Sequence, residues 1–353
     1  MDGFQIHPYG NCIKGVHFQM TRYILQKIVF SLVTLFVILT VNFFIFRVAP
    51  GDPISMMLNP RTRPEIKEKI REQFGVDKPL WLNFEAFREE GGVTALFDTQ
   101  YSHYFKSLAQ RELGHSFRQK QPVAELIGQR IGPTVLLILT GEVIGVFFGV
   151  IFGMIAAWKA NSKLDTAILI SSLTAWSMPL FWLGLILLTL ARGIFPSGGF
   201  ITLGATFSST FAMWFDVAKH LILPATTLGI LLFGSYTITV RNSALEVLAE
   251  DYIKTAKAKG LNQKRILWSH ALKNASLPLA TLIAMDLGFA MGGSIQIETI
   301  FSYPGLGRLM FDAIFQRDYP VLQGVFLLLA VTLIAANFLA DLTYLLLDPR
   351  IRE

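Results

Sequence analysis

The sequence predicts an all-α membrane protein with six transmembrane helices and one long segment outside the bilayer, between the first and second helices. Of its 353 residues, 52% are hydrophobic and only 16% are charged, whereas soluble domains carry about 25% charged residues. A helix needs roughly 20 apolar residues to cross the hydrocarbon core of a bilayer. Six stretches of about that length hold almost no charge: 28–46, 131–157, 166–191, 221–240, 274–297 and 321–340.

The first apolar stretch is expected to stay in the mature protein. It is too long for the core of a secretory signal, and no small-x-small exit precedes Arg47. A single cysteine, Cys12, excludes an internal disulfide, and no Cys/His cluster has zinc spacing. The net charge of +6 is explained by basic loops beside membrane helices, so nucleic acid is not an expected partner.

Segment 47–130 is the one sizeable part outside the membrane. It opens with a turn-rich stretch at 49–53. A helical pattern follows over 63–74, with Pro64 in the first turn, where a helix tolerates it, and Gly75 where a C-terminal cap belongs.

The lysines and arginines predict the orientation. The four loops expected on the cytoplasmic side hold 3, 2, 7 and 2 lysines and arginines in chain order, and each of the two short external loops holds 2. Segment 47–130 holds 13, but loops longer than roughly 60 residues are largely exempt from the positive-inside bias. Both termini are therefore expected in the cytoplasm. The cytoplasmic loops in this count are 1–27, 158–165, 241–273 and 341–353, and the short external ones are 192–220 and 298–320.

Glycines and prolines recur within the apolar stretches and at their edges. Gly145, Gly149 and Gly153 repeat a small-x-x-x-small spacing, which allows two helix backbones to approach closely. They indicate ordinary bundle packing or, alternatively, kinks beside a translocation path. Prolines within or at the edges of the stretches are Pro133, Pro179, Pro224 and Pro278.

Loop 241–273 is too long for a simple turn and is expected to be partly helical. Glu250 and Asp251 suit the positive N-terminal end of a helix, Gly260 would end it, and 261–265 would begin a second element. The pattern is typical either of a short helix that docks into a groove on a partner or of a basic loop beside anionic lipid.

This loop resembles the coupling loop of bacterial ABC-importer permeases, in the form found in the dipeptide/oligopeptide/nickel permease family. The general form of that loop has Glu-Ala-Ala where this chain has Lys254-Thr255-Ala256. The resemblance rests on the peptide-family form and extends over the chain from about residue 21 to its end. The strings that carry it are 251–252, 256–261, 270–275, 277–278, 51–53, 75–80, 113–116, 122–123, 177–182, 298–307, 317–320 and 348–352.

The resemblance implies the type I ABC-importer permease fold, with a first helix at 28–46, a five-helix transmembrane domain at 131–346 and a cytoplasmic tail at 347–353. It implies half of a pore for di- or oligopeptides in the bacterial cytoplasmic membrane. Nickel, glutathione, haem or oligosaccharide on the same scaffold is the alternative. The implied partners are a homologous second permease, two ABC ATPase subunits, an extracytoplasmic binding protein and the lipid bilayer.

No phosphate-binding loop of the Gly-x4-Gly-Lys-Ser/Thr type occurs in the chain. The chain is therefore not expected to hold ATP by that route, and the resemblance implies a transport subunit that is not an enzyme and binds no cofactor of its own. ATP and magnesium would be held by the partner ATPases.

Five residues of the loop are expected to contact the ATPase. Ala256 and Ala258 would allow close approach, Gly260 would make the turn, and Tyr252 and Leu261 would be apolar anchors. The lysines of the loop are expected to be solvated or to face lipid.

Two carboxylates, Glu142 and Asp286, lie inside predicted spans. Because a charge at membrane depth is expensive, such residues usually face water or the bundle interior. They are expected to line the path, meeting the amino terminus or a cationic side chain of a peptide, or else to be buried, protonated or hydrogen-bonded to Thr or Asn neighbours. An ion-coupled transporter that uses both as a relay is a second function class, and it requires inverted repeats that the sequence does not display. An intramembrane enzyme is a third, and the predicted spans contain no histidine.

Overall fold

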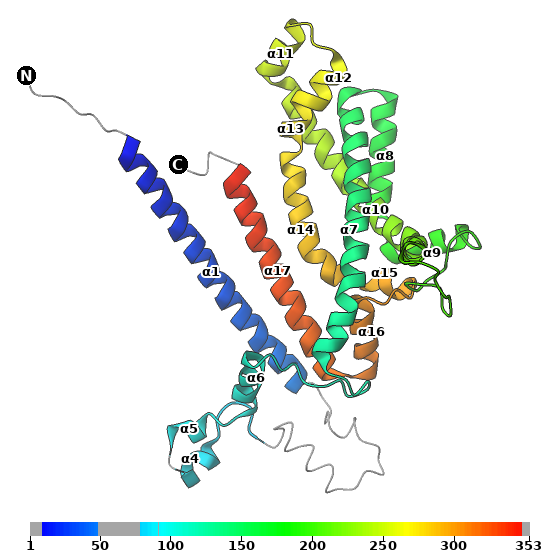
Figure 1. Ribbon diagram of the computed structural model, residues 1–353. Coiled ribbons are helices and arrows are strands. Elements are labelled where there is room, and N and C mark those ends of the chain that lie inside the picture. Colours follow the sequence, from blue (N-terminus) through cyan, green and yellow to red (C-terminus); the bar gives the residue numbers. More distant parts are fainter. Residues whose placement is uncertain (1–8, 49–77, 91, 348–353) are drawn as a thin grey trace, which may run out of the picture. The chain divides into compact units, whose positions relative to one another are not determined.

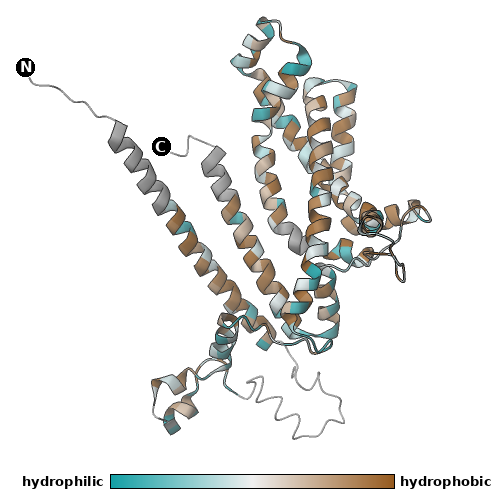
Figure 2. Cartoon of the chain, in the orientation of Figure 1, coloured by the Kyte–Doolittle hydropathy of each residue, from teal (hydrophilic) through white to brown (hydrophobic). Residues whose placement is uncertain are grey.

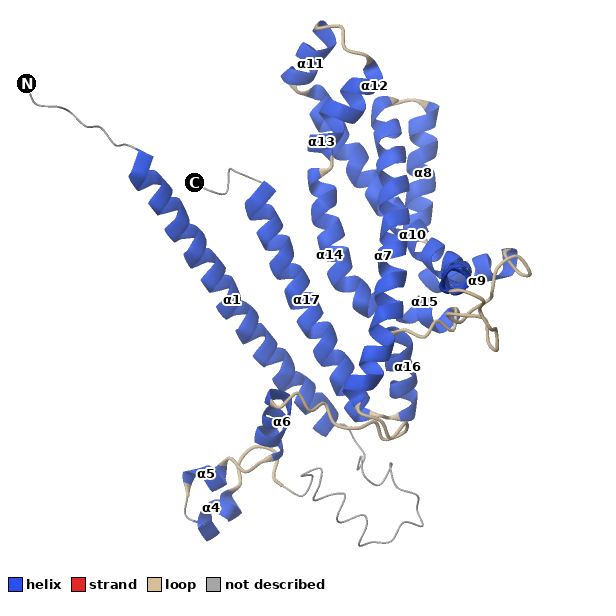
Figure 3. Ribbon diagram, viewed as in Figure 1, coloured by secondary structure: helices blue, strands red, loops and turns tan. Residues whose placement is uncertain are grey.

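A computed structural model describes residues 9–48, 78–90 and 92–347, and this part of the chain is helical (Figure 3). These ranges hold no β-strand, only isolated bridges at His115–Pro122 and Arg192–Phe195. The all-α prediction is confirmed. The predicted turn at 49–53, the helix at 63–74 and the string at 348–352 lie outside the described residues.

Figure 1 labels most of the helices, which vary from one turn to more than ten. In chain order they are α1 (Tyr9–Val48), α4 (Phe84–Glu90), α5 (Val93–Leu96), α6 (Gln100–Ala109), α7 (Val123–Trp158), α8 (Lys163–Ser177), α9 (Leu180–Leu190), α10 (Thr210–Ala249), α11 (Asp251–Ala258), α12 (Gln263–Arg265), the π-helical turn η1 (Ile266–Ala271), α13 (Leu272–Ala275), α14 (Leu277–Gly293), α15 (Ile295–Ile300), α16 (Leu306–Gln316) and α17 (Tyr319–Leu347).

Four of the predicted spans are single helices long and apolar enough to cross a bilayer. They lie in α1, α7, α10 and α17, and Figure 2 shows apolar residues along each of them. The third predicted span is a bent pair, α8 and α9, with an angle of 104° between its halves. The fifth contains α14, whose apolar part is shorter and runs over Leu277–Gly288. The predicted multi-span helical architecture is confirmed, with a bend in the third span.

The bend between α8 and α9 has a local cause. Pro179 has no N–H to continue the hydrogen-bond ladder, and its ring pushes the preceding residue out of the helical region. Met178 is accordingly extended, with φ −70° and ψ 133°, and Pro179 caps the start of α9. Pro133 and Pro224, in contrast, lie inside α7 and α10 without ending either helix.

The chain forms two compact units, which are described separately. One combines residues 133–307 with the flanking parts of α1 and α17, and the other joins residues 36–132 to 308–330.

The first unit is built on close packing of α7 against α10. A Cβ added to Gly145 would lie 2.6 Å from the Cβ of Leu232, and one added to Gly149 would lie 2.6 Å from the Cβ of Tyr236. Gly153 approaches the backbone carbonyl of Thr237 in the same way. These glycines therefore allow close helix contact, as the packing interpretation expects, and α7 runs through them as one continuous helix.

The second unit is fixed in part by a buried aspartate. Asp318, 2% exposed, accepts hydrogen bonds from the Ser116 hydroxyl at 2.5 Å and from the backbone N–H groups of Phe117 and Arg118. These bonds tie the turn before α7 to the start of α17. An aromatic cluster of the same unit joins the end of α1 to α6 and its neighbours, and its members are Phe36, Phe43, Phe44, Trp81, Tyr101, Tyr104 and Phe105.

Candidate functional site

The segment between α10 and α14, residues 250–276, is called here the coupling segment. It corresponds to most of the predicted loop 241–273, and it is helical apart from its two end residues and the turn at 259–262. Residues 241–249 continue α10, so the loop begins about nine residues later than the sequence suggested. The predicted helix after Glu250 is present as α11, with Asp251 in its first turn and Lys257 in its last, as the helix dipole favours.

Helix α11 has one buried face and one exposed face. Ile253 is fully buried and Ala256 is 5% exposed, and both belong to a hydrophobic core that also includes residues of α10, η1, α13 and α14. The remaining residues of the helix are exposed. Lys254 forms an exposed ion pair with Asp251 at 2.7 Å. The apolar face therefore fastens the helix to its own bundle and leaves the polar face outward.

The turn after α11 needs a glycine. Gly260 has φ +73°, a left-handed conformation that glycine adopts at little cost, and no heavy atom lies within 4 Å of an added Cβ. The side chain of Asn262 then caps α12 by accepting from the N–H of Lys264. Leu261 packs against the core from the edge of the turn. The predicted turn and second element are thus both present.

A hydrogen bond holds the N-terminal end of α11 to α13. The amide nitrogen of Asn274 donates to the hydroxyl of Tyr252 at 2.8 Å. The Tyr252 side chain remains 41% exposed, so its ring is partly available to a partner surface while its hydroxyl is positioned.

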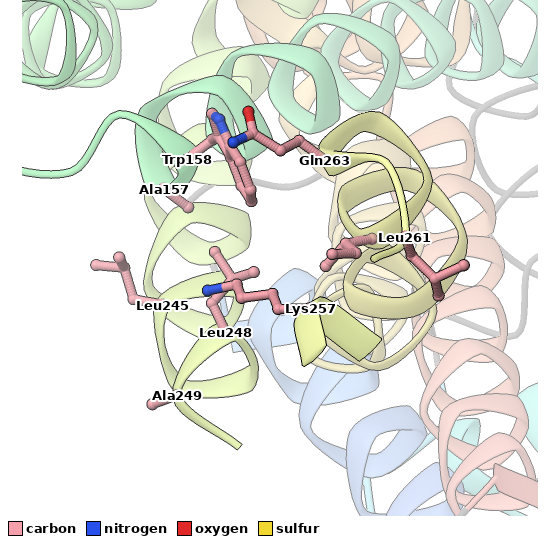
Figure 4. A pocket seen from close by; sticks show the side chains of 9 residues that line it. Ala157, Trp158, Leu245, Leu248, Ala249, Lys257, Leu261 and Gln263 are labelled. Carbon is pink, nitrogen blue, oxygen red and sulfur yellow. The ribbon is translucent and has the colours of Figure 1, made fainter. Parts of the chain in front are cut away.

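A cavity of about 690 Å³ opens beside the coupling segment. Figure 4 shows side chains around it that come from the C-terminal ends of α7 and α10 and from the stretch 257–263. Most of these side chains are apolar, and Lys257 is the charged member. The lining residues are Ala157, Trp158, Leu245, Leu248, Ala249, Lys257, Leu261, Gln263 and Ile266.

The structure places the five predicted ATPase-contact residues in one segment but not on one surface. Tyr252, Ala258 and Gly260 are exposed, Leu261 is partly buried, and Ala256 points into the core. A small residue at position 256 is explained by the packing of α11 on its own bundle. The role of all five in contacting a partner stays a prediction.

The two intramembrane carboxylates meet through a third side chain. The Tyr236 hydroxyl lies 2.5 Å from Glu142 Oε1 and 2.7 Å from Asp286 Oδ2. Glu142 is 5% exposed, Tyr236 is fully buried and Asp286 is half-buried. These three residues, called here the carboxyl–tyrosine cluster, join α7, α10 and α14. Their partner is therefore a tyrosine, and not the Thr or Asn that the sequence suggested.

Sequence reasoning missed Tyr236, although a signal exists. Leu228, Leu232, Tyr236 and Val240 recur every four residues on α10, opposite glycines that recur every four residues on α7. A tyrosine in that register must place its hydroxyl near the α7 surface. The signal becomes visible only when the two helices are known to pack together.

An ion pair at the N-terminal end of α8 was also missed. Arg241 donates from Nε to Asp165 Oδ1 at 2.6 Å and from Nη2 to Asp165 Oδ2 at 2.7 Å. The N–H of Asn161 donates to the same carboxylate at 2.9 Å. The Arg241 and Asp165 side chains are 14% and 3% exposed, so the ion pair is largely shielded from water. Its bidentate geometry, in which two N–H groups bind the two carboxylate oxygens, is the strong form of this interaction.

Residues 149–353 match the family described as the binding-protein-dependent transport system inner membrane component, and residues 20–138 match the N-terminal part of such components. The chain is 35% identical over 336 residues to the oligopeptide transport system permease protein AppB of Bacillus subtilis, over 94% of this chain and 99% of that protein. It is also 35% identical over 354 residues to the dipeptide transport system permease protein DppB of Escherichia coli K12, over 95% and 99%.

A solved structure of the MetNI methionine ABC transporter, in an inward-facing conformation, matches with a TM-score of 0.52 and 18% identity. It covers 64% of this chain and 97% of the matched chain. At 18% identity, this similarity shows that the two chains share a fold and nothing more.

Proposed function

Since the chain belongs to the family of inner-membrane components of binding-protein-dependent transport systems, we propose that it forms half of the translocation pore of an ATP-binding-cassette importer for peptides. The substrate class is supported by relatives named for oligopeptide, di/tripeptide and dipeptide transport, each of which the chain matches over nearly its full length. Nickel, glutathione, haem or oligosaccharide on the same scaffold remains the alternative.

The observation that carries the proposal is the way the coupling segment packs against the helices that precede and follow it. Helix α11 turns an exposed face outward and is fastened through Ile253 and Ala256 to a core shared with α10 and α14. Because close-packed interiors transmit strain, a push on α11 would reach both helices. That suits a motor subunit that acts from outside the chain and biases a two-state pore.

The proposed partners follow from the family. Two ABC ATPase subunits would supply the push, with ATP and magnesium bound in them. A homologous second permease would complete the pore in the lipid bilayer, and an extracytoplasmic binding protein would deliver the peptide. The coupling segment and both termini would then face the cytoplasm of a bacterial cell, as the lysines and arginines predict.

Asp286 and Glu142 are proposed to contribute to the substrate path. Asp286 is the more exposed of the two and would be the residue to meet a cationic group. This role depends on the peptide assignment.

Copurification of the tagged chain with its ATPases tests the coupling role. The Ala258→Trp variant places a bulky ring on the exposed end of α11 and should greatly reduce the ATPase recovered and the transport of peptide into vesicles that contain the binding protein. Ala205→Trp is the matched control, since Ala205 is also exposed but lies in the loop between α9 and α10. Equal ATPase recovery from both variants would refute this coupling surface.

Two further measurements separate the alternatives. Mass spectrometry of the ligand carried by the cognate binding protein distinguishes peptide from nickel, glutathione, haem and oligosaccharide. Uptake by the purified chain alone, driven by an ion gradient and independent of ATP, would establish the ion-coupled transporter instead.

A further inference from the structure

The carboxyl–tyrosine cluster contains more acceptors than its one hydroxyl can serve. The Tyr236 oxygen is within hydrogen-bond distance of both Glu142 and Asp286, at 2.5 and 2.7 Å. A phenol has one proton to donate, and an ionised carboxylate can only accept. Both contacts are hydrogen bonds only if one carboxyl group carries a proton and donates it to the tyrosine oxygen.

We infer that the cluster is a proton-binding site within the membrane-spanning bundle, with the proton on Glu142. The direction of the chain is then Glu142 to Tyr236 to Asp286: the carboxylic acid donates to the phenol oxygen, and the phenol donates to the Asp286 carboxylate. The cluster carries one negative charge instead of two.

Burial decides which carboxyl holds the proton. Glu142 is 5% exposed, and its Oε2 has no hydrogen-bond partner among the described residues. An ionised carboxylate with one oxygen buried and unpaired is strongly disfavoured, whereas the carbonyl oxygen of a neutral acid tolerates that position far better. Asp286 is half-buried and is the better place for the remaining charge.

No cation in the described part of the chain neutralises the cluster by direct contact. The nearest arginine along α10, Arg241, makes its two short bonds to Asp165 of α8. Asp286 is the one ionisable residue of α14. The other titratable side chains of α7 and α10 lie farther along those helices and are Glu125 and Arg130 on α7, and Asp216, Lys219, His220 and Glu246 on α10.

The position of the site gives the proton a mechanical consequence. Helices α10 and α14 precede and follow the coupling segment, and the Tyr236–Asp286 bond joins them directly. With the proton in place, one hydrogen-bonded chain holds α7, α10 and α14 together. Without it, two like charges compete for a single hydroxyl, and the link between the helices on either side of the coupling segment is weakened.

Infrared difference spectroscopy of the full chain in lipid nanodiscs tests the site without any transport partner. At neutral pH the chain should show the C=O stretching band of a buried protonated carboxylic acid. Glu142→Gln, which keeps the shape of the acid and can donate to Tyr236, should remove that band. Tyr236→Phe should move it to the higher frequency of an acid without a hydrogen bond.

Glu125→Gln is the matched control, because Glu125 is an exposed carboxylate on the same helix, and it should leave the band unchanged. Retention of the band in Glu142→Gln, or its absence from the unmodified chain at neutral pH, overturns the inference. Because the measurement involves neither ATPase nor peptide, its result is independent of the proposed transport function.

Discussion

Replacing Gly149 by alanine should weaken the packing of α7 against α10. The new methyl carbon would lie 2.6 Å from the Cβ of Tyr236, whereas carbon atoms in contact are ordinarily about 3.5–4.0 Å apart. Because the Tyr236 Cβ is attached to the backbone, no rotamer change relieves the clash, and the helices must separate by roughly 1 Å.

The expected size of this effect combines two opposing contributions. Overpacking of this kind costs about 1–3 kcal/mol, while alanine favours the helix over glycine by up to about 1 kcal/mol. Gly149→Ala should therefore lower the free energy of unfolding by up to about 2 kcal/mol.

The matched control is Gly128→Ala on the same helix, where no heavy atom lies within 4 Å of the added Cβ. Only the helix-propensity gain applies there, so this variant should be unchanged or more stable by up to about 1 kcal/mol. Denaturant titrations of both variants in mixed micelles, followed by far-UV circular dichroism, give the two free energies. If Gly149→Ala is as stable as Gly128→Ala, the close contact of α7 with α10 is refuted.

Arg241→Ala should lower the free energy of unfolding by about 3–5 kcal/mol, because it leaves the buried Asp165 carboxylate without its counter-charge. In the same micelle titration, a variant that lacks both side chains should be more stable than Arg241→Ala. A double variant less stable than Arg241→Ala would contradict this reasoning. Ile253→Ala removes a fully buried side chain and should destabilise the packing of α11 on the bundle by about 2–5 kcal/mol. Hydrogen exchange over 251–260 should accelerate. Unchanged exchange would show that other contacts hold α11. The Lys78 ammonium donates to Asp98 and, with His103 on the same carboxyl, holds the pKa of Asp98 below its usual range. The stabilisation is present above the ordinary Asp pKa and is lost as pH falls through the lowered one, so protection of 78–109 from hydrogen exchange should fall with acidification below about pH 4. Lys78→Met, which removes the larger of the two contributions, should reduce that acid dependence.

The parts of this molecule that the sequence predicts well are those that neighbouring residues determine. A run of apolar residues indicates a buried or membrane-spanning helix wherever it stands in the chain, which is why each of the six stretches contains helix. Gly260 is comparable, because a glycine after a run of helix-forming residues marks a left-handed turn.

The bend in the third span shows the limit of such reasoning. Pro133, Pro179 and Pro224 each interrupt the backbone ladder in the same way, yet only at Pro179 does the described helix break. The surrounding packing decides whether a helix runs through a proline, and that packing involves residues distant in sequence.

The site depends on long-range pairing even more strongly. Tyr236 is 94 residues from Glu142 and 50 residues from Asp286 along the chain, so no local pattern announces that the three meet. Ala256 illustrates the same point on a smaller scale. Its size suggested a smooth outward surface, but the helix turns that face inward because Ile253 must be buried with it.

The π-helical turn η1 sets the rotational phase of what comes after it. A wide turn of this type accommodates one residue more than an ordinary α-helical turn. Deleting a single residue from Ile266–Ala271 would restore regular spacing and leave the following helix in phase, whereas deleting one from 279–285 in the regular part of α14 would rotate the residues after it by about 100°. That rotation would carry Asp286 off the side of α14 that meets the Tyr236 hydroxyl, so the wide turn tolerates a change in chain length that the membrane helix itself does not.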